Sequence, residues 1–373
     1  MKEKTKIRQS NFELMRIISM IMIVMWHLIF HSVLFDQATG VTKFVLELLV
    51  LVGTVHVNSF ILLTGYFQSD KDFSLKKFLS IIKTVWFYKV IILFFILFMG
   101  IRVTTKLEIF KELLPIDTRD YWFINVYLVL YILSPYLNIL INKMTQQQYR
   151  KLLIISFILF SVLPILTNNA TVSNNGYTVI NFCFLYFIGG YLRKYPIENN
   201  FHIRNYSTNK IQFIFFIILI FSFMMNFIIY QFSKQLILMN NALLNELGNN
   251  FIINYRSYSN PIVLIQSISY FIYFGTLTLK SNVINKIGKN VVDVYLIHEN
   301  YYISSVLYTW IGVSKWLNYS GYAIIALTIL VPIIIFAVCI LISFIKGLFC
   351  NFLESRKIYR KVSNIFYNYI EKF

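Results

Sequence analysis

Two ionisable residues, Arg16 and His27, lie within one apolar stretch of the sequence, residues 12–34. In a helix that turns about 100° per residue, their spacing brings both side chains to within roughly 20° of one direction. The rise of about 1.5 Å per residue separates them by roughly 16 Å along that face. A charge at the centre of a bilayer costs about 2.5 to 3.5 kcal/mol even on the mildest scale, so such residues commonly mark a site. We therefore expect a membrane enzyme supplied from the cytoplasm, with Arg16 near the inner membrane edge and His27 near mid-bilayer.

Histidine suits general-base chemistry, because neutral imidazole can deprotonate a hydroxyl group near working pH. His27 is therefore the predicted catalytic base, and Arg16 is expected to orient its partners or to meet an anionic donor. Glu13, three residues before Arg16, also offers a local ion pair at the membrane edge. His56 and His298 fall at a similar depth in two later apolar segments, about 13 to 23 Å from the inner face by helix rise. We predict that both bind substrate in one cavity with His27; the alternative is a structural hydrogen bond between helices, worth about 0.6 kcal/mol.

Further polar residues lie at depth in the predicted spans. Asn58 and Ser59 follow His56 directly, and protein, ligand or water must satisfy their hydrogen-bonding groups. Asn125 indicates a polar cavity wall in the fourth span. Trp122 lies at the start of the same span, at the outer interface, where most aromatic residues belong to the interfacial belt. We predict that these four residues also bind substrate.

Three lysines, Lys76, Lys77 and Lys83, follow the second span, after Ser74 as a plausible N-cap. Lys76 and Lys83 are seven residues apart and therefore share one helix face at the inner membrane surface. The three are a candidate phosphate-binding patch for a cofactor, and contact with lipid headgroups is the alternative.

Composition places the whole chain in a membrane. Of its 373 residues 58% are hydrophobic and 13% are charged, about half the charge of a soluble domain. The net charge of +18 does not indicate nucleic-acid binding, because the basic residues are spread over loops between apolar segments. The three cysteines, Cys183, Cys339 and Cys350, show no metal or redox spacing, and we expect neither a metal centre nor a disulfide.

These patterns predict an all-α, polytopic integral membrane bundle of about ten transmembrane helices. The first apolar run lacks a cleavage site for a signal peptide and is expected to remain as the first span. The excess of Lys and Arg in alternate loops puts both termini in the cytoplasm. The expected spans are 12–34, 43–67, 79–100, 121–142, 150–167, 178–194, 210–232, 261–279, 289–313 and 321–347.

The chain is expected to divide into a ten-span membrane domain, residues 1–348, and a C-terminal tail, residues 349–373. The tail alternates basic and aromatic residues, which predicts an amphipathic helix on the inner membrane surface, in contact with membrane lipids. Two long outer segments, 101–120 and 233–260, are candidates for covering an acceptor site or for forming a loosely packed cap.

Several motifs are familiar in their order and spacing. They are Asn11-Phe12-Glu13-Leu14-Met15-Arg16, the Arg16–His27 pair, Phe60-Ile61-Leu62-Leu63-Thr64-Gly65-Tyr66-Phe67, Tyr121-Trp122-Phe123 with Ser134-Pro135-Tyr136-Leu137-Asn138, and Ile287-Gly288-Lys289-Asn290 with Tyr295-Leu296-Ile297-His298. Together they resemble the membrane proteins of acyltransferase family 3, over residues 8 to about 345.

The resemblance implies ten spans and O-acylation of surface carbohydrates, with cytoplasmic acetyl-CoA as donor and an extracytoplasmic or lipid-linked glycan as acceptor. By that analogy His27 is the catalytic base or a transient acyl carrier, with Arg16 as its companion. Many relatives carry a pair of arginines on the inner loop after the second span, where this chain has Lys76, Lys77 and Lys83. The expected location is the bacterial cytoplasmic membrane.

A transporter or flippase for a glycan or lipid-linked sugar is the alternative, because buried histidines and lysines also suit proton coupling. The sequence shows no convincing inverted repeat or matched pair of broken helices, which are typical of transporters. Acyl transfer is therefore the favoured prediction.

Overall fold

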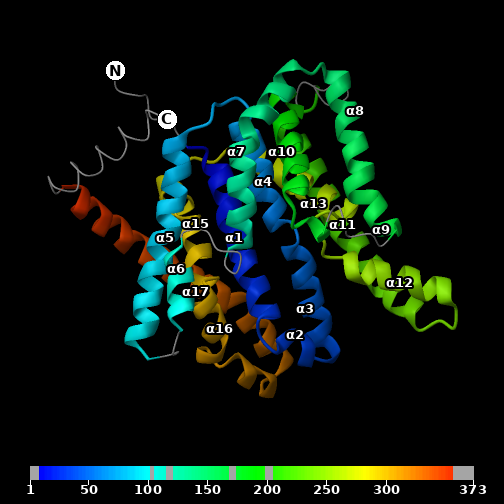
Figure 1. The fold of residues 1–373 in the computed structure, drawn as a ribbon. Coiled ribbons are helices and arrows are strands. Elements are labelled where there is room, and N and C mark those ends of the chain that lie inside the picture. Colours follow the sequence, from blue (N-terminus) through cyan, green and yellow to red (C-terminus); the bar gives the residue numbers. More distant parts are fainter. Residues whose placement is uncertain (1–7, 101–104, 115–120, 168–173, 198–204, 356–373) are drawn as a thin grey trace.

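The computed structural model describes residues 8–100, 105–114, 121–167, 174–197 and 205–355, and these residues form helices and no strand. Figure 1 shows the helices gathered into one bundle, with α12 projecting at its side. In chain order the elements are α1 (Ser10–Phe30), α2 (Leu34–Gln37), α3 (Gly40–Gly53), α4 (His56–Gln68), α5 (Leu75–Phe98), α6 (Lys106–Leu113), α7 (Trp122–Lys143), α8 (Gln146–Phe157), the π-helical η1 (Ile158–Val162), α9 (Leu163–Thr167), η2 (Asn174–Gly176), α10 (Val179–Lys194), α11 (Thr208–Ile237), α12 (Ala242–Asn254), α13 (Pro261–Gly275), α14 (Asn282–Gly288), α15 (Val291–His298), α16 (Tyr301–Trp310), η4 (Val313–Asn318) and α17 (Gly321–Ser355).

The all-α membrane fold is confirmed, since seven described helices are long and apolar enough to cross a bilayer. They are Ser10–Phe30, Gly40–Gln68, Leu75–Phe98, Trp122–Lys143, Gln146–Leu166, Thr208–Ile237 and Gly321–Phe352. The predicted sixth and eighth spans coincide with α10 and α13, which have only 16 and 15 residues. The count of ten and the cytoplasmic position of both termini stay predictions.

The predicted ninth span, 289–313, is wrong as a continuous helix. It consists of α15, which ends at His298, and α16, which begins at Tyr301. The side chain of Asn300 accepts a hydrogen bond from the backbone N–H of Tyr302 at 3.1 Å and so caps α16. Asparagine favours this capping position over the helix interior, which explains why the chain breaks here.

A short turn at Thr54 and Val55 separates α3 from α4 within the segment Gly40–Gln68, directly before His56. The hydroxyl of Thr54 donates to the carbonyl of Leu51 at 2.7 Å, which satisfies one acceptor at the end of α3. The structure therefore interrupts two of the predicted spans, and each interruption lies next to a predicted site histidine, His56 or His298.

The two long segments predicted as outer loops contain regular structure. Segment 101–120 includes α6, which packs beside α5, and segment 233–260 includes the end of α11 and all of α12. At the C-terminal end, α17 runs without interruption past residue 348 to Ser355. The rest of the predicted tail, 356–373, lies outside the described residues.

Two helices cross at very short range in the half of the bundle that carries α4. Gly65 of α4 faces the backbone of Tyr186, and Gly189 of α10 faces the backbone of Leu62. A Cβ atom at either glycine would overlap a carbonyl oxygen of the other helix. Small residues allow such close backbone approach between helices in membranes.

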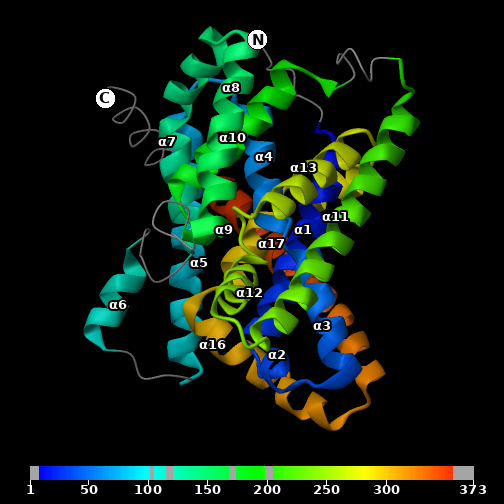
Figure 2. The same ribbon diagram turned by 90° about the vertical axis from the view of Figure 1, so that its right-hand side faces the viewer.

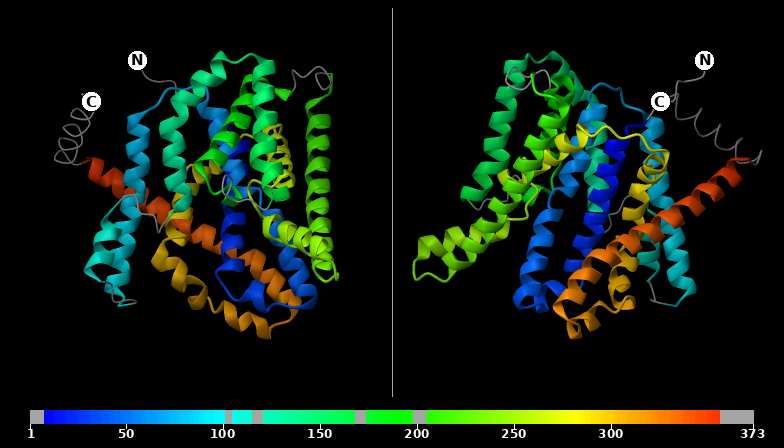
Figure 3. Two further views of the ribbon diagram at one scale, coloured as in Figure 1. Left: turned by 45° about the vertical axis from the view of Figure 1, so that its right-hand side comes forward. Right: turned by 180° about the vertical axis from the view of Figure 1, so that it is seen from behind.

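The outer surface of the bundle is apolar and much of its interior is polar. Phe98, Phe213 and Leu341 are exposed, whereas Asn58 and Gln266 are completely buried. Figure 2 shows α11 and α13 side by side, and Figure 3 shows α17 crossing obliquely past α1 and α15, which it contacts. The exposed apolar faces suit a lipid environment, and polar groups inside can bind each other or a ligand.

Candidate active site

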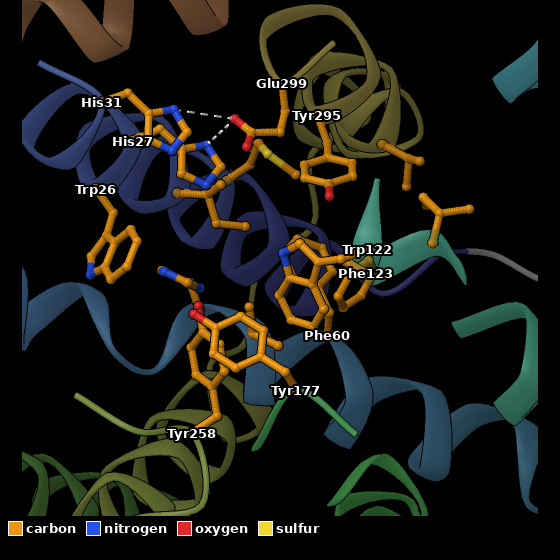
Figure 4. Close-up of a pocket in the computed structure, with 16 residues that line it drawn as sticks. Trp26, His27, His31, Phe60, Trp122, Phe123, Tyr177, Tyr258, Tyr295 and Glu299 are labelled. Carbon is orange, nitrogen blue, oxygen red and sulfur yellow. Dashed lines mark ion pairs between the residues drawn. The ribbon is translucent and has the colours of Figure 1, made fainter. Parts of the chain in front are cut away.

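A cavity of about 220 Å³ lies where helices begin, end or break. His27 reaches it from the last turn of α1, His56 from the break before α4, and Glu299 from the break after α15. Trp122 enters from the first residue of α7, and Tyr258 from the segment before α13. Figure 4 shows the two histidine rings of α1 facing Glu299, with aromatic side chains across the pocket.

His27 is held by two neighbours on one side of its ring. Its Nδ1 lies 3.0 Å from Nε2 of His298, in a hydrogen bond, and 2.8 Å from a carboxylate oxygen of Glu299. His298 Nδ1 lies 2.7 Å from the carbonyl oxygen of Val294. A carbonyl only accepts, so His298 Nδ1 carries the proton and His298 Nε2 accepts from His27 Nδ1.

This assignment leaves the other ring nitrogen of His27, Nε2, without a proton in the neutral form. Among the described residues, none forms a hydrogen bond with Nε2, and His27 lines the cavity. A proton taken up by Nε2 would make the ring positive, and the Glu299 carboxylate would stabilise that charge at short range. The arrangement can therefore act as a general base.

His31 lies one helical turn after His27 and shares the same carboxylate. The two rings stack at 4.9 Å between centroids and 7° between planes. His31 Nδ1 lies 3.9 Å from Glu299, at the limit of an ion pair. One carboxylate therefore serves two imidazoles, and His27 holds the closer position.

His27, His31 and Glu299 also have donor atoms that all lie within 4.8 Å of one another, close enough to hold one metal ion. The N–H at Nδ1 of His27, which lies 2.8 Å from the Glu299 carboxylate, accounts for this contact without an ion. The donor set therefore does not require a metal, and the expectation of none stays a prediction.

His56 is buried, and both of its ring nitrogens are without a hydrogen-bond partner among the described residues. Its ring meets Trp26 and Tyr258 edge-on, at centroid distances of 6.2 and 5.6 Å. Buried polar atoms in folded proteins are almost always paired with protein, water or ligand. His56 also lines the cavity, and its two ring nitrogens are buried.

The other predicted substrate-binding residues lie in different places. Trp122 lines the cavity and packs on Tyr177 at 4.5 Å between ring centroids. Asn58 does not line it; its amide donates to the carbonyl of Tyr258 at 2.9 Å. The Ser59 hydroxyl donates to the carbonyl four residues earlier in the chain, at 2.6 Å. Asn125 is half-buried and does not line the cavity.

The predicted donor-binding residues lie away from the cavity. Arg16 is 31% exposed and pairs with Glu13 at 3.4 Å. Lys76, Lys77 and Lys83 are exposed on the first turns of α5. The N-cap predicted for that helix is confirmed, because the side chain of Ser74 accepts from the backbone N–H of Lys77.

Sequence reasoning did not find Glu299 as a site residue. The sequence contained a signal for it, because Glu299 is an ionisable residue inside the predicted ninth span. An ionisable residue within a span commonly marks a site, which is the reason that Arg16 was selected. Tyr177 and Tyr258 gave no comparable signal, since they lie in short segments between helices and reach the cavity through tertiary folding.

Comparison with protein-family models decides the classification. The model of an acyltransferase domain, acyltransferase family 3, matches residues 9–348, nearly the whole chain. The chain belongs to acyltransferase family 3. Membership in acyltransferase family 3 indicates a membrane acyltransferase, and the matched range includes Arg16, His27 and Glu299. No curated protein and no solved structure matched the chain.

Proposed function

We propose that this family member is a membrane O-acetyltransferase. It transfers an acetyl group from cytoplasmic acetyl-CoA to a hydroxyl of an extracytoplasmic or lipid-linked cell-surface polysaccharide, in the cytoplasmic membrane of a bacterium. The observation that carries the proposal is the position of His27, whose Nδ1 is held by His298 and Glu299 while Nε2 remains for the cavity. The acetyl group, the donor and the acceptor are additions to what the family indicates.

In the proposed reaction, Nε2 of His27 accepts the proton of the acceptor hydroxyl as its oxygen attacks the thioester carbonyl. The carbonyl oxygen becomes negative, the carbon–sulfur bond breaks, and the thiolate of CoA leaves with the proton that His27 had taken. Glu299 stabilises the imidazolium formed in between. His56 is placed to donate to or accept from the substrate, since its ring nitrogens have no partner among the described residues.

The donor must reach the cavity from the Arg16 end of α1. By helix rise, Arg16 and His27 are about 16 Å apart. A donor whose phosphates lie near Arg16, or at Lys76, Lys77 and Lys83, can bridge this distance only through a long, narrow arm. The pantetheine arm of CoA has that shape, which supports CoA over a compact acyl donor.

The acceptor side of the cavity is aromatic. Trp26, Trp122, Tyr177 and Tyr258 present ring faces or edges to it. The C–H groups on the flat face of a sugar ring pack well on such rings, and Tyr hydroxyls and the Trp N–H add hydrogen bonds. This lining supports a carbohydrate acceptor.

The first test is the ester content of purified surface polysaccharide from cells with the wild type, with His27→Ala, or without the protein. Ester that mild alkali removes is expected only with the wild type, at matched protein levels. Equal ester in all three samples would refute acyl transfer.

A transporter is the second candidate function, favoured by the two helix breaks beside His56 and Glu299. A transporter changes where the glycan is located and leaves its ester content unchanged. If cells with His27→Ala have less surface glycan than wild-type cells but the same ester content per sugar, the result would therefore favour transport.

A further inference from the structure

A second cavity, of about 460 Å³, adjoins the first and shares Trp26 and Tyr177 with it. Its polar lining comes from Asn175, Arg256 and Ser257. No residue of the proposed acyl-transfer chemistry lines this second cavity. It therefore offers space beside the reaction centre for a part of the substrate that does not react.

Arg256 is the charged residue that lines this cavity, and its guanidinium group packs against aromatic rings. Its guanidinium carbon lies 4.4 Å from the ring centroid of Phe30, 5.7 Å from Trp26 and 5.9 Å from Tyr255. No carboxylate of the described residues pairs with it, although Arg256 is half-buried. Nearby Lys234, by contrast, is neutralised by Glu47 at 2.6 Å.

The segment that carries Arg256 is fixed on both sides by asparagines. The amide of Asn226 donates to the carbonyl of Tyr255 at 3.1 Å, and the amide of Asn58 donates to that of Tyr258 at 2.9 Å. The backbone N–H of Tyr258 donates to the carbonyl of Asn175 at 3.0 Å. Because the backbone around Arg256 is held before any ligand arrives, little ordering is needed on binding.

We infer that the second cavity binds an anionic group of the acceptor, a carboxylate or a phosphate, through Arg256. The hydroxyl to be acylated then lies in the first cavity, on an adjacent unit of the same glycan. Arginine's planar fork matches both anions, and a half-buried cation without a counterion gains most from one. This inference rests on the proposed function and specifies its substrate class as an acidic glycan.

The test is equilibrium binding to the purified full-length protein in nanodiscs of neutral lipid, without acetyl-CoA. The probes are trigalacturonic acid, its carboxyl-reduced neutral trisaccharide, and a glycerol phosphate trimer. We expect the wild type to bind at least one acidic probe about tenfold more tightly than the neutral one. Arg256→Gln should reduce that preference to about twofold or less, and Arg256→Lys should retain part of it.

Lys315→Gln is the matched control, because it removes one exposed positive charge from η4 without contact to either cavity. It should keep the full preference for the acidic probe. A wild type without acid preference, or a preference unchanged in Arg256→Gln, overturns the inference. If Arg256→Gln does not fold, Arg256→Lys decides, since a preference undiminished in it also contradicts recognition by the guanidinium.

A lipid headgroup is the other source of a phosphate at this position. Adding phosphatidylglycerol to the nanodiscs separates the two sources. If the wild type still binds the acidic probe more tightly than the neutral one in the presence of phosphatidylglycerol, the result supports an acidic glycan. If the lipid abolishes this preference, the inference is overturned. Acetyl-CoA turnover by the wild type and His27→Ala, measured in parallel, reports on the proposed function independently of binding.

Discussion

At the scale of single residues, the reactivity of His27 depends on neighbours that are far away in the sequence. Arg16 shares its helix face but lies about 16 Å away by helix rise. The groups in contact with its Nδ1 atom are His298 and Glu299, about 270 residues later in the chain. Arg16, which the sequence pairs with His27, is therefore not its contact partner, whereas Glu299, at the end of α15, is.

Glu299→Gln tests this stabilisation. The amide keeps the shape of the side chain but removes the negative charge 2.8 Å from His27 Nδ1. We expect kcat for acyl transfer to fall by about 10- to 100-fold, with KM for the acceptor changed by about threefold or less. Glu299→Asp should recover part of the loss.

Glu246→Gln is the control. Glu246 is exposed on α12 and does not line the cavity, so this substitution removes the same charge at a distance from the site. Its kcat should stay within about twofold of the wild type. A Glu299→Gln enzyme with normal kcat would show that the carboxylate only supports the fold.

At the scale of elements, helix breaks and close crossings set the positions of the site residues. The break before α4 places His56 at the cavity, and the break after α15 places Glu299 beside His27. The α4 helix is in turn fixed by its close crossing with α10 through Gly65 and Gly189. A change at that crossing should therefore reach the site through α4.

Gly65→Ala and Gly189→Ala test the crossing. Each added methyl group would overlap a backbone carbonyl that cannot rotate away. We expect each to destabilise the fold by about 3 kcal/mol, seen as a lower midpoint of thermal unfolding in detergent. Gly347→Ala in α17 is the matched control, because nothing lies within 4 Å of its added Cβ, and alanine favours the helix. Equal midpoints for all three variants would contradict a close crossing.

At the scale of the whole molecule, the cavity lies between two hydrophobic clusters. One cluster includes Met20 and Tyr295, and the other includes Val57 and Tyr258; all four residues line the cavity. In the proposed reaction the acyl group and the glycan meet between these two clusters. The proposed entry of cytoplasmic acetyl-CoA from the Arg16 end requires α1 to begin at the cytoplasmic side and to end toward the outside.

Cysteine labelling tests that orientation. In a variant whose three native cysteines are alanine, Lys76→Cys and Tyr322→Cys are compared, both residues being exposed. A membrane-impermeant maleimide should label Tyr322→Cys on intact cells, and Lys76→Cys only after permeabilisation. The reverse pattern would invert the topology and place the aromatic cavity toward the cytoplasm.

From the amino-acid sequence we could predict the membrane class, most helix positions and the N-cap Ser74. These follow from hydropathy and local chemistry, which depend on neighbouring residues alone. It also selected His27, His56, Trp122 and His298, because polar or aromatic groups stand out in apolar segments.

Which of these residues meet in space depends on the tertiary structure. It replaced the continuous ninth span by two helices, because Asn300 caps α16 and so ends the helical path at Glu299. The Asn58 amide donates to the carbonyl of Tyr258, and the Arg256 guanidinium packs against three aromatic rings. Most of these contacts join segments that are far apart in the chain. Such contacts depend on how helices pack, and the period of one helix carries no information about its partner.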